Sequence, residues 1–198
     1  IAREKSGILR FSIDNLEASP ELVEEKLGEC RALVLKEGIL YVNANGSGGV
    51  HRLEDSVGDG RYDLVSSVRS TPGGGDHGHN DMALGPDGLL YAIHGDAIGV
   101  SDTFTTRFPL TYEFGPKLRG VGGYVARTDG RKSWEIFAGG LRNAYGIAFH
   151  RHGEIFTYDA DHERDQGLPL YRPTRILHVV SGGDYGWRSE HLKWPAYY

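Results

Sequence analysis

Residues 81–96 read DMALGPDGLLYAIHGD, and two other stretches repeat this pattern: ALVLKEGILYVNANG (32–46) and GIAFHRHGEIFTYDAD (146–161). Each stretch has an apolar run, a short polar turn that ends in glycine, and a second apolar run. Short apolar runs separated by turn residues are typical of β-strands. Glycine suits the hairpin position that needs a positive φ. Each of the three stretches is therefore predicted to form a β-hairpin.

The spacing of the three hairpins indicates the architecture. Their turn glycines, Gly38, Gly88 and Gly153, are 50 and 65 residues apart. Strand–turn–strand units repeated at such distances are typical of β-propeller blades, which are four-stranded sheets of roughly 40–50 residues. The sequence therefore predicts an all-β fold, a single incomplete β-propeller domain over residues 1–198 with about three to four blades. A β-sandwich with similar hairpins is the alternative fold, but the repeated hairpin motif favours the propeller.

One stretch departs from this all-β pattern. Residues 19–27 read SPELVEEKL, with Ser19 as a candidate N-cap and Pro20 at the first helical position. Serine and proline are favoured at these two positions of a helix. The sequence predicts a short helix there.

Composition narrows the classes of function. The chain has 198 residues and a formal net charge of -5, with 39% hydrophobic and 25% charged residues. A packed core is expected, and no cluster of Lys and Arg suggests a nucleic-acid partner. Cys30 is the one cysteine, so an internal disulfide is excluded. No apolar run approaches the roughly 20 residues of a membrane helix, so no transmembrane segment is expected in this chain.

The stretch GGGDHGHND (73–81) is rich in groups that carry chemistry. It makes a weak phosphate loop, because no Lys-Ser/Thr pair follows. A zinc site is an alternative, since His77 and His79 alternate in a loop beside carboxylates. The alternative without a chemical role is a polar loop that joins two blades. The stretch precedes an inner hairpin, and such loops surround the central channel where propeller active sites lie.

Four other stretches carry candidate groups. Residues 54–65 (EDSVGDGRYDLV) partly match a calcium loop, although a hairpin turn at Asp59-Gly60 is favoured because two ligand positions lack carboxylates. Residues 139–149 (GGLRNAYGIAF) place Arg142 and Asn143 before an inner hairpin, where a guanidinium could face an anion. Residues 158–169 (YDADHERDQGLP) are dense in carboxylates that suit a hard cation, or form a solvated loop. In SGGDYGWR (181–188), the aromatic residues are expected to pack between blades.

Taken together, HGHNDMALGPDGLLYAIHGD, GLRNAYGIAF and SGGDYGWR resemble the soluble quinoprotein glucose/sorbosone dehydrogenase family. The run from YDADHERDQGLP to KWPAYY looks most like the dehydrogenase propeller domain of large planctomycete-type secreted proteins that often carry a haem-binding cytochrome region. The resemblance begins at about residue 32 and keeps the order of the family's motifs. It implies a six-bladed β-propeller that holds pyrroloquinoline quinone (PQQ) and Ca²⁺ at the mouth of its channel.

The resemblance also implies roles for particular residues. The family's catalytic base lies eight residues before the glycine that opens GPDG, which is His77 here, with His79 as an additional neighbour of the cofactor. The base takes a proton from a sugar or alcohol hydroxyl while hydride passes to the quinone. The family's Arg-Asn pair, which contacts the quinone, matches Arg142 and Asn143. At the positions that match the family's cation ligands, this chain has other residue types. The predicted metal ligands are Asp159, Asp161 and His162.

Further implications concern the surroundings of the protein. The resemblance implies a periplasmic or secreted location and an electron acceptor such as a cytochrome, with haem in a C-terminal region outside this chain. It implies a small sugar or alcohol as substrate. Two other functions stay open: a non-catalytic propeller that binds carbohydrate or protein, and a calcium-dependent lactonase-like hydrolase.

Overall fold

The computed structural model describes residues 1–3, 5–71, 74–101, 103–106, 122–131, 133–160 and 173–187. Apart from a 3-10 turn, η1 (Asn45–Ser47), all regular structure in these ranges is β-strand. The strands are β1 (Ser6–Arg10), β2 (Glu21–Gly28), β3 (Cys30–Lys36), β4 (Ile39–Ala44), β5 (Gly49–Glu54), β6 (Leu64–Ser70), β7 (His79–Leu84), β8 (Leu90–His94), β9 (Thr105–Thr106), β10 (Gly123–Thr128), β11 (Glu135–Leu141), β12 (Ile147–Phe149), β13 (Ile155–Asp159) and β14 (Arg175–Val179).

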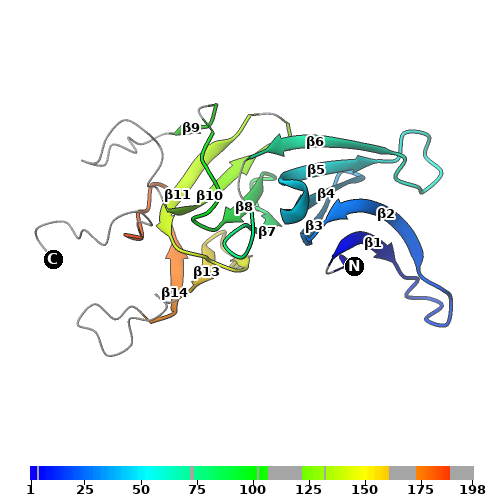
Figure 1. The fold of residues 1–198 in the computed structure, drawn as a ribbon, viewed down its shortest axis with the longest axis horizontal. Helices are drawn as coiled ribbons and strands as arrows, with labels where there is room; N and C mark the ends of the chain where they lie inside the picture. Colours follow the sequence, from blue (N-terminus) through cyan, green and yellow to red (C-terminus); the bar gives the residue numbers. More distant parts are fainter. Residues whose placement is uncertain are drawn as a thin grey trace, which may run out of the picture.

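The strands form four successive sheets that follow the chain (Figure 1). After the β1–β2 hairpin come the meander β3–β4–β5–β6, the sheet β7–β8–β10–β11 with β9 parallel at its edge, and the sheet β12–β13–β14. The first strands of the three larger sheets are neighbours in space, with β3 beside β7 and β7 beside β12. Sheets arranged with their first strands innermost are propeller blades. The chain is an all-β, partial β-propeller, as the repeats predict.

The three hairpin turns predicted from the repeats are confirmed. The turns join β3 to β4, β7 to β8 and β12 to β13, with Lys36 opposite Ile39, Leu84 opposite Leu90 and Phe149 opposite Ile155. The glycine of each turn has a positive φ, +80° at position 38, +77° at 88 and +92° at 153. A side chain would be strained in this conformation, which explains why glycine recurs there.

The core lies between neighbouring blades, and β8 shows how it is built. Every residue of this strand is buried. Leu90 and Ala92 belong to the apolar cluster shared with the first blade, whereas Tyr91 and Ile93 belong to the cluster shared with the third. Alternate side chains of a strand point to opposite faces, so one strand contributes to two interfaces. An apolar run without polar interruption is the sequence pattern of such a strand.

The helix predicted for residues 19–27 is wrong. These residues lead into β2, which pairs with β1 and places Leu22 opposite Leu9. Leu27, together with Ile8 of β1, joins the apolar cluster beside β3 and β4. Helix propensity is a weak preference, and pairing with β1 plus burial of Leu27 outweighs it.

The candidate calcium loop at residues 54–65 is a turn between β5 and β6, as favoured from the sequence. The Asp55 carboxylate accepts backbone N–H bonds from Gly58, Asp59 and Gly60 at 2.7, 3.2 and 2.7 Å. These N–H groups hold the pKa of Asp55 below its usual value. The carboxylate therefore closes the turn itself.

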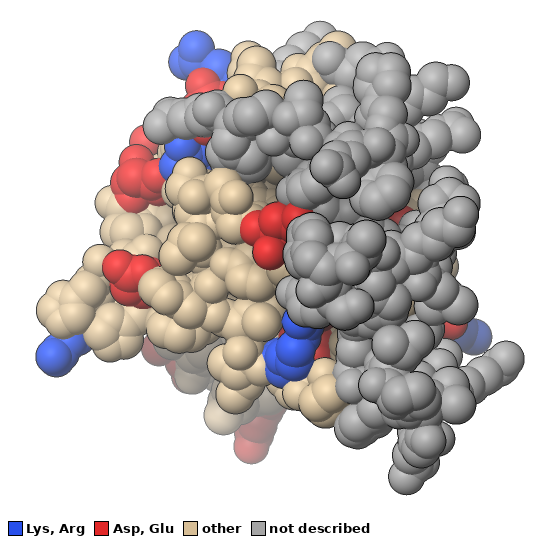
Figure 2. All heavy atoms as spheres, turned by 90° about the vertical axis from the view of Figure 1, so that its left-hand side faces the viewer, with Lys and Arg blue, Asp and Glu red and all other residues tan. Residues whose placement is uncertain are grey.

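Charged side chains are sparse on one face of the described part of the molecule (Figure 2). Figure 2 shows the face on the left of Figure 1, where the described Lys, Arg, Asp and Glu side chains are few and separated. Within the described ranges, no helix has the length and hydropathy to cross a membrane. The absence of a nucleic-acid partner stays a prediction.

Apolar burial between the second and third blades is expected to contribute strongly to stability. Ile93 is 0% exposed and Ile176, on the outer face of β14, is 78% exposed. Ile93→Ala should lower the free energy of unfolding by about 2–5 kcal/mol, because it leaves a cavity in a packed core. The matched Ile176→Ala should change it by about 0.5 kcal/mol or less. Urea denaturation measures both, and equal losses would contradict this description of the core.

Candidate functional site

The loop that carries His77 is fixed to the first blade by polar contacts. Asn45 and Arg31 both donate to the backbone oxygen of Gly75, each at 3.1 Å. The side-chain oxygen of Asn45 also accepts the backbone N–H of His79 at 2.9 Å. The loop just before β7 is therefore held at both its start and its end, although Gly75 and Asp76 are exposed.

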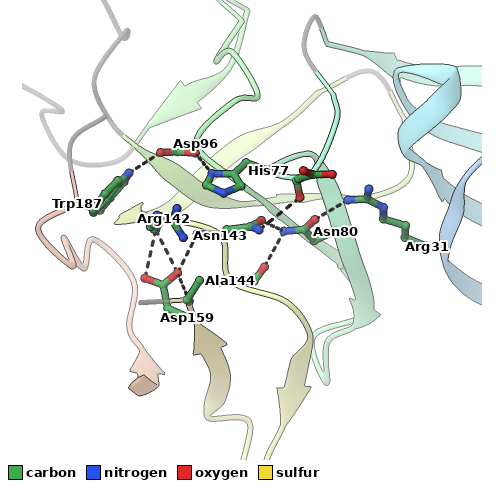
Figure 3. Close-up of polar contacts among 11 residues, drawn as sticks. Arg31, His77, Asn80, Asp96, Arg142, Asn143, Ala144, Asp159 and Trp187 are labelled. Carbon is green, nitrogen blue, oxygen red and sulfur yellow. Dashed lines mark hydrogen bonds and ion pairs between the residues drawn. The ribbon is translucent and has the colours of Figure 1, made fainter. Parts of the chain in front are cut away.

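Asn80 joins this loop to both neighbouring blades (Figure 3). Its side-chain nitrogen donates to the side-chain oxygen of Asn143 at 2.7 Å and to the carbonyl of Ala144 at 2.9 Å. Its oxygen accepts from Arg31 of β3 at 2.9 Å. Asn80 is buried, and burying an amide without hydrogen-bond partners would cost free energy. These three hydrogen bonds replace the bonds that the amide would make with water. The entrances to three inner strands are thereby fixed relative to one another.

His77 forms an acid–base pair with Asp96. The ring nitrogen Nδ1 lies 2.6 Å from Oδ1 of Asp96, and the two side chains are 24% and 9% exposed. Asp96 follows β8, and its backbone N–H donates to the carbonyl of Arg142 at 2.8 Å. With the neutral ring, a carboxylate that accepts from Nδ1–H leaves Nε2 as the basic nitrogen. The geometry therefore prepares Nε2 of His77 to take a proton.

Arg142 and Trp187 complete this group of residues (Figure 3). The indole N–H of Trp187 donates to Oδ2 of Asp96 at 2.5 Å, so both oxygens of this carboxylate have a partner. The guanidinium carbon of Arg142 lies over the Trp187 ring, 5.4 Å from its centroid, a cation–π distance. Arg142 is mostly buried. A fixed guanidinium thus lies close to the acid–base pair.

Asp159, at the end of β13, holds the Arg142-Asn143 turn. Its carboxylate accepts the backbone N–H of Arg142 at 3.1 Å, of Asn143 at 2.9 Å and of Ala160 at 3.1 Å. Arg175 adds an ion pair at 3.1 Å. The side chain is 0% exposed and is surrounded by donors. Its observed role is to position the turn.

Of the three predicted metal ligands, only Asp159 lies among the described residues. Both oxygens of Asp159 already accept hydrogen bonds from backbone N–H groups or from Arg175, so this carboxylate is engaged by protein donors in place of a metal ion. The other two candidates, Asp161 and His162, lie outside the described residues. Among the described residues, no group of three or more His, Cys, Asp or Glu side chains is arranged to hold a metal ion. A cation site after β13 stays a prediction.

His79 does not share the site of His77. Its ring is completely buried, with Nε2 3.3 Å from the hydroxyl of Thr71 and its plane edge-on to the ring of His94. Burial lowers the pKa of His79 to about 4, and the charges of Arg31 and His51 act in the same direction. The ring is thus enclosed between blades and separate from His77, and a contact of His79 with a cofactor stays a prediction.

The structure therefore brings together three of the residues selected from the sequence, His77, Arg142 and Asn143. It adds Asp96 and Trp187, which sequence reasoning missed as site residues. Asp96 carried a usable signal, because it ends the inner hairpin that His77 precedes. Trp187 lay in a stretch that was interpreted only as packing between blades.

Comparison with known structures identifies the fold. The chain is a partial β-propeller with an acid–base pair and a fixed guanidinium where the chain enters its inner strands. Solved structures with this fold include a candidate oxidoreductase (glucose dehydrogenase) from Thermus thermophilus, with a TM-score of 0.64 and 24% identity over 94% of this chain and 60% of that one. The PQQ-bound aldose sugar dehydrogenase of Streptomyces coelicolor gives a TM-score of 0.60 and 17% identity over 93% and 57%.

A further glucose dehydrogenase gives a TM-score of 0.60 and 14% identity over 92% of this chain and 62% of that one. The chain thus has the glucose dehydrogenase-like propeller fold and spans about 60% of the length of these structures. No protein-family model matches the sequence, and no curated protein matches it at a significant level.

The buried histidines are expected to make the fold sensitive to acid. An unfolded histidine has a pKa of about 6.5, and that of folded His79 is about 4. As pH falls from about 6.5 to about 4, the unfolded chain takes up the proton first, so stability falls across this window by on the order of 3 kcal/mol. Burial also lowers the pKa of His94, which acts in the same direction.

Urea midpoints measured from pH 8 to pH 4 test this expectation. His79→Gln keeps a polar group next to Thr71 and should reduce the dependence on pH. The exposed His150 provides a matched control, and His150→Gln should leave the dependence unchanged. An identical pH profile for wild type and His79→Gln would show that His79 is not the acid-sensitive group.

Proposed function

We propose that this chain forms part of a quinoprotein-type dehydrogenase that oxidises a hydroxyl of a sugar or alcohol. The observation that carries the proposal is the His77–Asp96 pair next to Arg142 and Asn143 on a sugar dehydrogenase-like propeller. The PQQ-bound aldose sugar dehydrogenase among the similar structures supports the choice of cofactor. The activity of the whole protein is a proposal, because the chain spans about 60% of those structures.

In this proposal, His77 is the general base. Asp96 holds the Nδ1–H tautomer, so the lone pair of Nε2 is directed away from the carboxylate. A substrate hydroxyl that donates to Nε2 can transfer its proton there as the carbon–hydrogen bond breaks. The neighbouring carboxylate then stabilises the imidazolium, as in other histidine–carboxylate pairs.

The residues before β12 fit an anionic quinone. Arg142 offers a fixed positive charge. The side-chain amide of Asn143 accepts from Asn80 and donates to the backbone oxygen of Asp76, which restricts its orientation. Asp159 holds the backbone N–H of Asn143. Fixed donors stabilise developing negative charge without reorganising. When bound, a quinone would accept the hydride that leaves the substrate carbon, two-electron chemistry that amino-acid side chains cannot supply.

The remaining parts of the proposal concern the surroundings of this site. A Ca²⁺ ion would have to be held by groups other than the Asp159 carboxylate, such as Asp161 and His162 of the following residues or backbone carbonyls. We also propose a periplasmic or secreted location and an external electron acceptor such as a cytochrome, because a reduced quinone must pass its electrons on.

The test uses the purified protein with PQQ, Ca²⁺, a panel of sugars and alcohols, and an artificial electron acceptor. His77→Gln should lower kcat by about 10²–10⁴-fold, the usual contribution of a general base. The exposed His178 offers a control, and His178→Gln should retain activity. Circular dichroism and urea midpoints establish that both variants are folded.

Other outcomes would replace the proposal. Sugar binding without any PQQ binding would indicate a non-catalytic carbohydrate-binding propeller. Hydrolysis of lactones that needs Ca²⁺ but not PQQ would indicate a hydrolase. Full dehydrogenase activity in His77→Gln would remove His77 from the mechanism.

A further inference from the structure

Trp187 is placed beside the acid–base pair by a segment that runs along the edge of β11. The backbone N–H of Gly139 donates to Gly183, while Tyr185 and Trp187 donate to Gly139 and Gly140, at 2.8–3.0 Å. This approach is close: a Cβ atom at Gly140 would lie 2.7 Å from the backbone nitrogen of Tyr185. Gly140 of β11 therefore admits the segment, and the backbone hydrogen bonds to Gly139 and Gly140 fix the backbone of Trp187.

The side chain of Trp187 makes two contacts that differ in kind. Its N–H donates to Oδ2 of Asp96, while the other oxygen of that carboxylate bonds to His77. Its ring face lies beneath the guanidinium of Arg142. One side chain thus touches both the partner of the base and the residue proposed to face the quinone (Figure 3).

We propose that Trp187 is a positioning residue that sets the orientation of the Asp96 carboxylate, and through it the tautomer of His77. A carboxylate bonded through one oxygen can rotate about its Cβ–Cγ bond. A donor fixed on the second oxygen restricts that rotation and keeps the first oxygen directed at Nδ1. Nε2 of His77 is then the unprotonated nitrogen in most molecules. The tautomer assignment needs no cofactor, whereas its consequence for catalysis rests on the proposed function.

Trp187→Phe separates the two contacts of this side chain. Phenylalanine keeps an aromatic face for Arg142 but has no N–H for Asp96. The backbone contacts of residue 187 to β11 are unaffected by the change. Trp134→Phe is the matched control, because the buried indole N–H of Trp134 has no hydrogen-bond partner among the described residues.

The experiment measures ring ¹⁵N chemical shifts of the protein labelled in histidine, at pH 8 and without cofactor or substrate. In wild type and Trp134→Phe, Nε2 of His77 should resonate at the unprotonated end of the range and Nδ1 at the protonated end. In Trp187→Phe, the two shifts should move towards each other as the tautomers mix. His77→Gln identifies the resonances.

The kinetic consequence is measured separately. Trp187→Phe should lower kcat by about 10-fold or more, as losing the partner behind a functional histidine does elsewhere, with a smaller change in KM. If the His77 shifts in Trp187→Phe equal those of wild type, the proposal is overturned. If the shifts change as expected but neither protein has dehydrogenase activity, the positioning role holds and the proposed function fails.

Discussion

Asn80 makes three hydrogen bonds to two other segments of the chain: it accepts from Arg31 of the first blade and donates to Asn143 and Ala144 at the entrance of the third. Blades of a propeller touch mainly through apolar side chains, and apolar contacts tolerate small sliding. A buried amide with directional hydrogen bonds to both neighbouring blades resists such sliding, because each lost bond leaves a polar group unsatisfied. The relative position of the three inner strands therefore depends on this side chain.

The residues of the site follow from that constraint. His77, Arg142 and Asn143 come from loops that lead into inner strands, and each of these loops is held by a side chain of another segment. Asp159 holds the turn of Arg142 and Asn143, and Trp187 contacts both Asp96 and Arg142. A base and a guanidinium from different blades can then be kept in a fixed relation without a helix or a disulfide to support them. Such fixed groups are what electrostatic catalysis needs.

The sequence was sufficient to predict the blades but only part of the site. Glycine turns and apolar runs of β8 are local signals, and they identify hairpins because the local geometry demands them. His77, Arg142 and Asn143 were found because they stand just before inner strands. The hydrogen bond between Asp96 and Trp187 joins residues that are 91 positions apart in the sequence. It forms because the segment that carries Trp187 packs closely against β11, and no local sequence pattern reveals that contact. The strand at β2 was missed for the same reason, because its partner β1 decides its conformation.

A crystal structure of the protein soaked with PQQ would show whether the quinone binds beside His77 and Arg142. The quinone should lie against the entrances of the inner strands, with donors of Arg142 and Asn143 within about 3.2 Å of its oxygens. His77 should remain bonded to Asp96, with Nε2 facing the space next to the quinone. No saturable binding of PQQ, or a quinone bound away from Arg142 and His77, would contradict the account.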